Sequence, residues 1–68
     1  MNVSMSDFEF MKECLSSAII TILVEEKGMS LSSAFDLFYN SDTYVKLSNP
    51  ATGLFFQSPR YVLSYLIP

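Results

Sequence analysis

A long N-terminal helix is the feature that most limits how this 68-residue chain can fold. Ser6 and Glu9 form a capping-box pattern, in which the hydroxyl accepts from an amide three residues on and the carboxylate reaches back. Gly28 follows Lys27 as a residue that can adopt a positive φ and end a helix. The pattern predicts one helix from about Asp7 to Lys27, which forms the spine of the domain.

The apolar side chains of this helix extend beyond one face. A stripe with helical spacing contains Phe8, Met11, Leu15, Ala18, Ile19 and Ile22. The flanking faces carry further apolar groups, namely Phe10, Cys14, Ile20, Leu23 and Val24. A helix that is apolar almost all round is central in its domain or packs on a partner. Residues 19–24 also fit a strand because several are β-branched, but the capping signals favour a helix.

Serine caps predict two further helices in the middle of the chain. Ser30 begins a second helix, whose apolar stripe consists of Leu31, Ala34, Phe35 and Phe38. Ser41 or Asp42 caps a short third helix, since short polar side chains favour helix starts over helix interiors. This helix must end near Ser48, because Pro50 disfavours helical backbone at the residue before it.

The segment that follows combines a turn, an apolar strip and another helix start. Residues 50–53 predict a turn in which Gly53 supplies the positive φ. Residues 54–56 predict an extended strip, in which Phe55 faces away from both neighbours because side chains alternate along extended backbone. Ser58 and Pro59 are typical of a helix start, so the last helix should run to about Leu66.

These elements predict the fold class. Residues 1–68 should form a single, small all-α domain of three to four helices, with a long first helix and a short extended strip near residues 54–56. So short a chain buries only about 60% of the surface that it exposes when unfolded, and its stability is correspondingly small. Half of its residues are apolar, so either the core is dense or another chain covers part of the surface.

The side-chain inventory argues against an enzyme, a metal site or a bound cofactor. The chain has no histidine, the commonest metal ligand and general base, and its one cysteine excludes an internal disulfide. Cys14 is interpreted as a small buried hydrophobe. The carboxylates of Glu9, Glu13, Glu25 and Glu26 are interpreted as solvated helix surface. We therefore expect no catalytic residues and no small-molecule substrate.

Hydropathy and charge indicate where the protein is located and whether it binds nucleic acid. The longest apolar run, residues 18–24, is far shorter than the roughly 20 residues that a membrane-spanning helix needs. The lone cysteine agrees with a reducing compartment, so we expect a cytoplasmic protein without a membrane segment. Four basic residues against seven acidic ones give a net charge of −3, which disfavours nucleic acid. Residues 31–47 resemble a helix-turn-helix, which keeps a small DNA-binding transcriptional regulator as the alternative function.

Aromatic side chains indicate the preferred function. Aromatic residues make up 15% of the chain, and tyrosine is enriched at protein interfaces because its ring is apolar and its hydroxyl polar. The predicted partner-binding residues are Phe55, Tyr39, Tyr44, Tyr61 and Tyr65. The chain is predicted to be a non-enzymatic protein-interaction module that either self-associates or binds a partner protein.

Two stretches resemble a family of short uncharacterised bacterial proteins. They are residues 30–44 and residues 52–62. The specific part is Thr52-Gly53-Leu54-Phe55-Phe56-Gln57-Ser58-Pro59 within the second stretch. The resemblance covers about residues 8–66, with Phe55 where the family more often has tyrosine. Members are common in gut Firmicutes and Bacteroides, often beside a toxin-like or transferase-like gene. The resemblance implies an antitoxin-like role with a co-encoded partner, and no catalytic residues.

Overall fold

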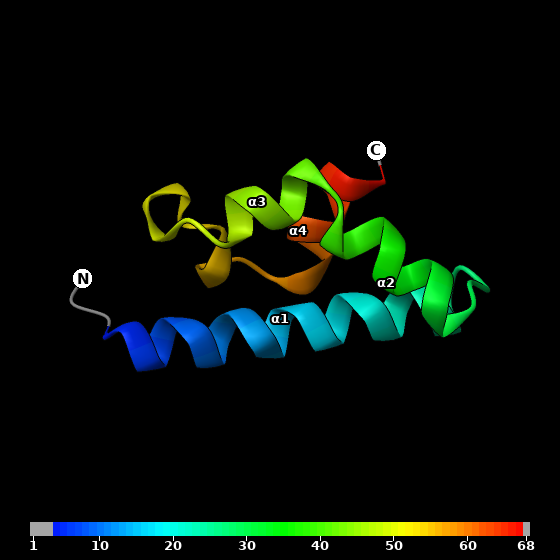
Figure 1. Cartoon of the computed structure of the whole chain (residues 1–68), viewed down its shortest axis with the longest axis horizontal. Helices are drawn as coiled ribbons and strands as arrows, with labels where there is room; N and C mark the ends of the chain where they lie inside the picture. Colours follow the sequence, from blue (N-terminus) through cyan, green and yellow to red (C-terminus); the bar gives the residue numbers. More distant parts are fainter. Residues whose placement is uncertain (1–3, 68) are drawn as a thin grey trace.

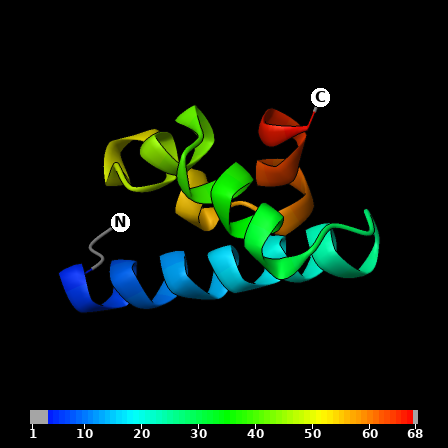
Figure 2. The same cartoon turned by 45° about the vertical axis from the view of Figure 1, so that its right-hand side comes forward.

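Helix α1 (Met5–Glu25) extends along almost the whole molecule in the computed structural model, which describes residues 4–67. At 1.5 Å per residue its 21 residues span about 31 Å, against a longest dimension of 37 Å. Helices α2 (Leu31–Tyr39), α3 (Asp42–Leu47) and α4 (Pro59–Leu66) all lie on one side of it (Figures 1 and 2). The predicted all-α fold with a long first helix is confirmed; residues 1–3 and 68 of the predicted domain lie outside the described part.

Helix α1 begins two residues before the predicted start. The cap is Ser4, whose hydroxyl accepts from the Asp7 amide at 3.1 Å, and not Ser6. Both serines have an acidic residue three positions on, but the earlier start adds the backbone hydrogen bond from Phe8 N to Ser4 O at 2.9 Å. The helix ends at Glu25, two residues before the predicted Lys27.

The C-terminal end of α1 confirms the predicted role of glycine. Gly28 has a φ of 70°, the left-handed conformation that reverses the chain after a helix. Residues 19–24 are helical, which resolves the ambiguity between helix and strand. No helix within residues 4–67 is both long and apolar enough to cross a membrane.

The core lies where α1 meets the other three helices. Its fully buried side chains come from all four helices: Ile19, Leu23, Ala34, Phe38, Leu47 and Val62. The buried face of α1 is rotated relative to the predicted stripe, because Ile20 and Leu23 are buried while Met11 and Ile22 are only half-buried. Cys14 is exposed, so its interpretation as a buried residue was wrong. It lies instead beside the segment before α4 and the start of that helix, where it lines an open apolar hollow.

Helices α2 and α4 confirm the predicted caps. The hydroxyls of Ser30 and Ser58 accept from amides three residues on, at 3.1 and 3.2 Å. A surface ion pair joins α4 to the end of α1, since the Arg60 guanidinium donates to both carboxylate oxygens of Glu26 at 3.1 and 2.5 Å. This hydrogen bonding lowers the pKa of Glu26 and raises that of Arg60.

Helix α3 is likewise capped as predicted. The Ser41 hydroxyl accepts from the Tyr44 amide at 3.1 Å, and the helix ends before Ser48. The chain then turns through the 3₁₀ helix η1 (Pro50–Thr52) to Gly53, which has a φ of 71°. The predicted turn with a positive φ at Gly53 is therefore confirmed.

Residues 54–56 do not form the predicted extended strip. They form a second 3₁₀ helix, η2 (Leu54–Phe56), in which Phe56 N donates to Gly53 O at 3.1 Å. A strip would need a neighbouring strand for its backbone groups, whereas the 3₁₀ turn satisfies them locally. Leu54 and Phe55 are both buried and Phe56 is 43% exposed. The prediction that Phe55 faces away from its neighbours was therefore wrong.

Candidate protein-binding groove

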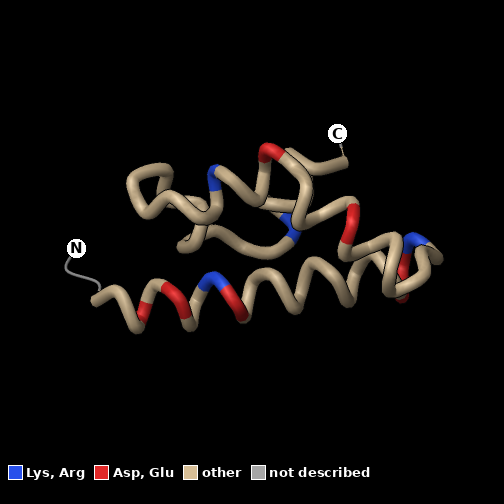
Figure 3. Tube along the Cα trace, in the orientation of Figure 1, with Lys and Arg blue, Asp and Glu red and all other residues tan. Residues whose placement is uncertain are grey.

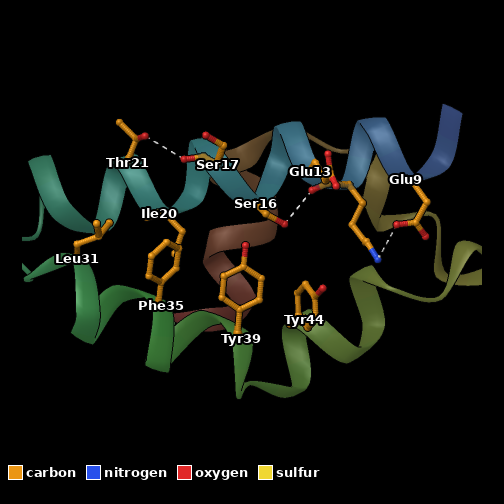
Figure 4. Close-up of a pocket in the computed structure, with 11 residues that line it drawn as sticks. Glu9, Glu13, Ser16, Ser17, Ile20, Thr21, Leu31, Phe35, Tyr39 and Tyr44 are labelled. Atoms are coloured by element: carbon orange, nitrogen blue, oxygen red, sulfur yellow. Dashed lines mark hydrogen bonds and ion pairs between the residues drawn. The ribbon is translucent and has the colours of Figure 1, made fainter. Parts of the chain in front are cut away.

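An open groove of about 610 Å³ lies between α1 and the α2–α3 pair (Figure 4). Its α1 wall consists of Glu9, Lys12, Glu13, Ser16, Ser17, Ile20 and Thr21. The opposite wall consists of Leu31, Phe35 and Tyr39 on α2 and Tyr44 on α3. The volume lies within the roughly 300–1,000 Å³ that is usual for binding pockets. One wall is mainly polar and the other aromatic and apolar.

The α2 wall is a row of apolar side chains that the domain leaves partly uncovered. Leu31, Phe35 and Tyr39 are four residues apart, so they share one helix face. Their exposed fractions are 56%, 42% and 43%. Ala34 and Phe38, on the adjacent face, are fully buried. Helix α2 therefore presents one apolar face to the core and a second one to the groove.

Neighbouring rings hold this aromatic row in place. The Phe35 and Tyr39 centroids are 5.6 Å apart, and the Tyr39 and Tyr44 centroids are 4.9 Å apart. The buried Phe38 ring packs edge-on against Tyr44 at 5.3 Å. Such aromatic contacts restrict the orientation of the Phe35, Tyr39 and Tyr44 rings.

The α1 wall places an acidic rim opposite this row. The Lys12 ammonium lies 3.3 Å from the Glu9 carboxylate and 5.8 Å from the Tyr44 centroid. The Lys12 ammonium is therefore paired within the chain, and its side chain is only 15% exposed. Glu13 is exposed and has no ion pair within residues 4–67. The N-terminal half of α1 carries more acidic than basic residues (Figure 3).

Two of the hydroxyls that line the groove donate to the backbone of their own helix. Ser16 donates to Lys12 O at 2.8 Å, and Thr21 donates to Ser17 O at 2.9 Å. Cys14 does not line the groove. Among the described residues, no group of three or more His, Cys, Asp or Glu side chains is placed to hold a metal ion. The groove offers apolar contact and a negative rim, which are features of recognition.

The five predicted partner-binding residues do not form one surface. Tyr39 and Tyr44 line the groove. Tyr61 and Tyr65 are exposed on α4, where their hydroxyls lie 2.9 Å apart and this hydrogen bond raises the pKa of Tyr61. Phe55 is only 5% exposed and belongs to the core.

Two groove residues belong to the single apolar stripe predicted for α2. Leu31 and Phe35 line the groove, whereas Ala34 and Phe38 of the same predicted stripe are buried in the core. The spacing of Leu31 and Phe35 with Tyr39, at intervals of four residues, was the signal for a second apolar face. Comparison with protein-family models, curated proteins and solved structures finds no match for this chain, so the family resemblance stays a prediction.

Proposed function

We propose that the chain is a non-enzymatic protein-interaction module that binds a helical segment of a partner protein in the groove. The observation that carries the proposal is the row of Leu31, Phe35 and Tyr39, which is exposed along one wall of an open groove. An amphipathic helix laid into an apolar groove is a recurrent mode of peptide recognition. Burying partly exposed aromatic side chains would supply its main driving force.

The dimensions of the groove favour a short helix as its occupant. Along α1 the lining extends from Glu9 to Thr21, which corresponds to about 18 Å at the helical rise. The apolar row on α2 covers about 12 Å by the same measure. A partner helix of about three turns would match this length, with apolar side chains repeating every three to four residues. Such a helix would pack against α1 and α2 together.

The charge of the rim favours a basic partner. Glu13 is exposed beside the groove, and the whole chain carries a net charge of −3. A lysine or arginine flanking the apolar stripe of the partner would find an unpaired carboxylate there. Complementary charge accelerates association and selects among partners more than it adds affinity. This pairing would therefore weaken at high salt.

The proposal extends to an antitoxin-like role, in which the partner is encoded beside this chain. That part rests on the sequence resemblance. A cytoplasmic location is part of the proposal, and the lone cysteine, Cys14, agrees with a reducing compartment. The alternative of a DNA-binding regulator has less support. Helix α3, the counterpart of a recognition helix, begins with Asp42 and carries Lys46 as its one basic residue. Phosphate contacts need more positive charge than that.

The proposal is tested by co-purification with the product of each neighbouring gene. The tagged chain should retain one of these proteins, and Phe35→Ser should reduce the retained amount at least tenfold. Val45→Ser is the matched control, because Val45 is 67% exposed on α3 and lies outside the groove. Glu13→Lys should weaken binding at low salt more than at high salt. If no neighbour is retained, the antitoxin-like role with a co-encoded partner is wrong; if Phe35→Ser and Val45→Ser behave alike, the groove is not the binding site.

A further inference from the structure

The groove has two chemically different ends. Three of its described lining residues are charged, and all three lie toward the N-terminus of α1: Glu9, Lys12 and Glu13. At the opposite end the lining consists of uncharged side chains, with Thr21 on α1 and Leu31 on α2 (Figure 4). We call the end with Glu13 the acidic end and the end with Leu31 the apolar end. A helix lying in the groove would therefore have two unequal directions.

The acidic end carries one uncompensated negative charge. The Lys12 ammonium lies 3.3 Å from the Glu9 carboxylate, so these two charges offset each other. The same ammonium lies 5.6 Å from the Phe8 centroid and 5.8 Å from the Tyr44 centroid, and both rings attract a cation. These contacts keep Lys12 away from Glu13, which is exposed and has no ion pair within residues 4–67. The free carboxylate at this end of the groove is thus that of Glu13.

We propose, on the basis of the groove's proposed function as a helix-binding site, that the partner helix lies in it in one direction. Its N-terminal turn lies at the acidic end and carries a lysine or arginine that pairs with Glu13. Its apolar residues follow over the next two turns, toward Leu31. The partner is therefore an amphipathic helix in which the basic residue precedes the apolar stripe in the sequence.

The dipole of the partner helix favours this direction. The N-terminus of a helix has free N–H groups and a partial positive charge, whereas the C-terminus has free carbonyl groups and a partial negative charge. With its N-terminus at the acidic end, the partner helix presents its positive end to Glu13. In the reverse direction its carbonyl groups would face the same carboxylate. Helices α1 and α2 run in opposite directions along the groove, so their own dipoles largely offset each other (Figure 4).

The geometry of helical side chains favours the same direction. Side chains on a helix tilt toward its N-terminus, so a lysine or arginine in the first turn extends past the end of the helix. At the acidic end it would reach toward Glu13. From Glu13 to Ile20 the α1 wall advances by about 10 Å at the helical rise. The partner's apolar residue that packs against Ile20 and Phe35 should therefore follow its basic residue by about seven positions.

Two synthetic peptides of about 12 residues test the position of the basic residue. Both have blocked ends, a hydrocarbon staple that keeps them helical, and leucines four residues apart on one face. One carries a single lysine in its first turn, and the other carries it in its last turn. At low salt, fluorescence anisotropy should give a dissociation constant about threefold lower, or less, for the first-turn peptide. Glu13→Gln, or about 1 M salt, should bring the two constants close together. Equal affinities for the wild type at low salt overturn the proposal.

A nitroxide label on the N-terminus of the first-turn peptide reports the direction of binding. In NMR spectra of the wild-type chain, it should broaden the amide signal of Glu13 more than those of Thr21 and Leu31. The double variant Glu13→Gln with Thr21→Glu moves the carboxylate to the other end of the same wall, at a position that is exposed. In this variant the broadening should move to the apolar end.

The outcomes separate the direction from the proposed function. If neither peptide binds, or if Phe35→Ser leaves the binding unchanged, the groove is not a helix-binding site and the proposed function fails with it. If the peptide binds with its label at the apolar end of the wild type, only the proposed direction is wrong. If the broadening stays at the acidic end in the double variant, Glu13 does not set the direction, and the proposal is overturned.

Discussion

Phe55 provides the sharpest test of the packing around η2, because its burial contradicts the alternation expected from the sequence. The side chain is 5% exposed, and its ring meets the Phe8 ring edge-on, with centroids 4.9 Å apart and planes at 84°. Removing a buried phenylalanine side chain costs about 3–5 kcal/mol, including the cavity it leaves. Phe55 also lines the open hollow between α1, η2 and the start of α4, so solvent can fill part of the cavity that its removal leaves. We therefore expect Phe55→Ala to cost about 3 kcal/mol.

That loss is large relative to the stability of so short a chain. At about 0.05–0.15 kcal/mol per residue, 68 residues give about 3–10 kcal/mol in total. Phe55→Ala should thus leave a marginally folded protein, and Phe55→Leu, which keeps most of the volume, should cost under about 1.5 kcal/mol. The matched control is Phe56→Ala. Because Phe56 is already 43% exposed, its removal should cost only about 1 kcal/mol.

Urea denaturation followed by far-ultraviolet circular dichroism measures these differences. The order of destabilisation should be Phe55→Ala well above Phe56→Ala and Phe55→Leu. An extended strip with Phe55 outward predicts the reverse order for the two alanine variants. If Phe56→Ala costs as much as Phe55→Ala or more, the assignment of Phe55 to the core is wrong.

Three further changes test local features. Ser58→Ala removes the cap of α4 and should cost about 1 kcal/mol in urea denaturation. Gly53→Ala should cost about 1–2 kcal/mol by the same assay, through backbone strain alone, since an added Cβ meets no atom within 4 Å at a φ of 71°. Arg60→Ala should raise the pKa of Glu26 toward its ordinary value of 4.5 in an NMR titration. Because the pKa of Glu26 is lowered in the folded state, the ion pair stabilises the fold at a pH above the ordinary pKa of this carboxyl. This stabilisation is lost as the pH falls through the lowered pKa.

Helix boundaries were predictable where a serine directly precedes the first residue of the helical pattern. Ser30 precedes Leu31 and Ser58 precedes Pro59, and the structure uses both serines as caps. Ser4 and Ser6 compete for the start of α1, because each has an acidic residue three positions on. The local pattern cannot rank them, since the choice depends on how much further the helix can extend. The error was two residues.

The rotation of α1 and the path of η2 depend on tertiary contacts, which local patterns do not contain. Apolar residues occur nearly all round α1, so Leu23 was equally compatible with the core and with a flanking face. The packing of α2, α3 and α4 determines which residues of α1 are buried, and it leaves Phe10 and Cys14 exposed. The groove was missed for the same reason. Its apolar row on α2 has the spacing of a core stripe, and Phe35 is 42% exposed because it faces the open groove.

Photo-crosslinking in cells that produce the protein tests the proposed function most directly. A photoreactive phenylalanine analogue placed at Phe35 would face the groove, and the same analogue at Val45 would face solvent on α3. The account predicts an adduct with one other protein at Phe35, identified by mass spectrometry, and none at Val45. No adduct at Phe35, equal adducts at both positions, or an adduct made only with a second copy of the chain would contradict it.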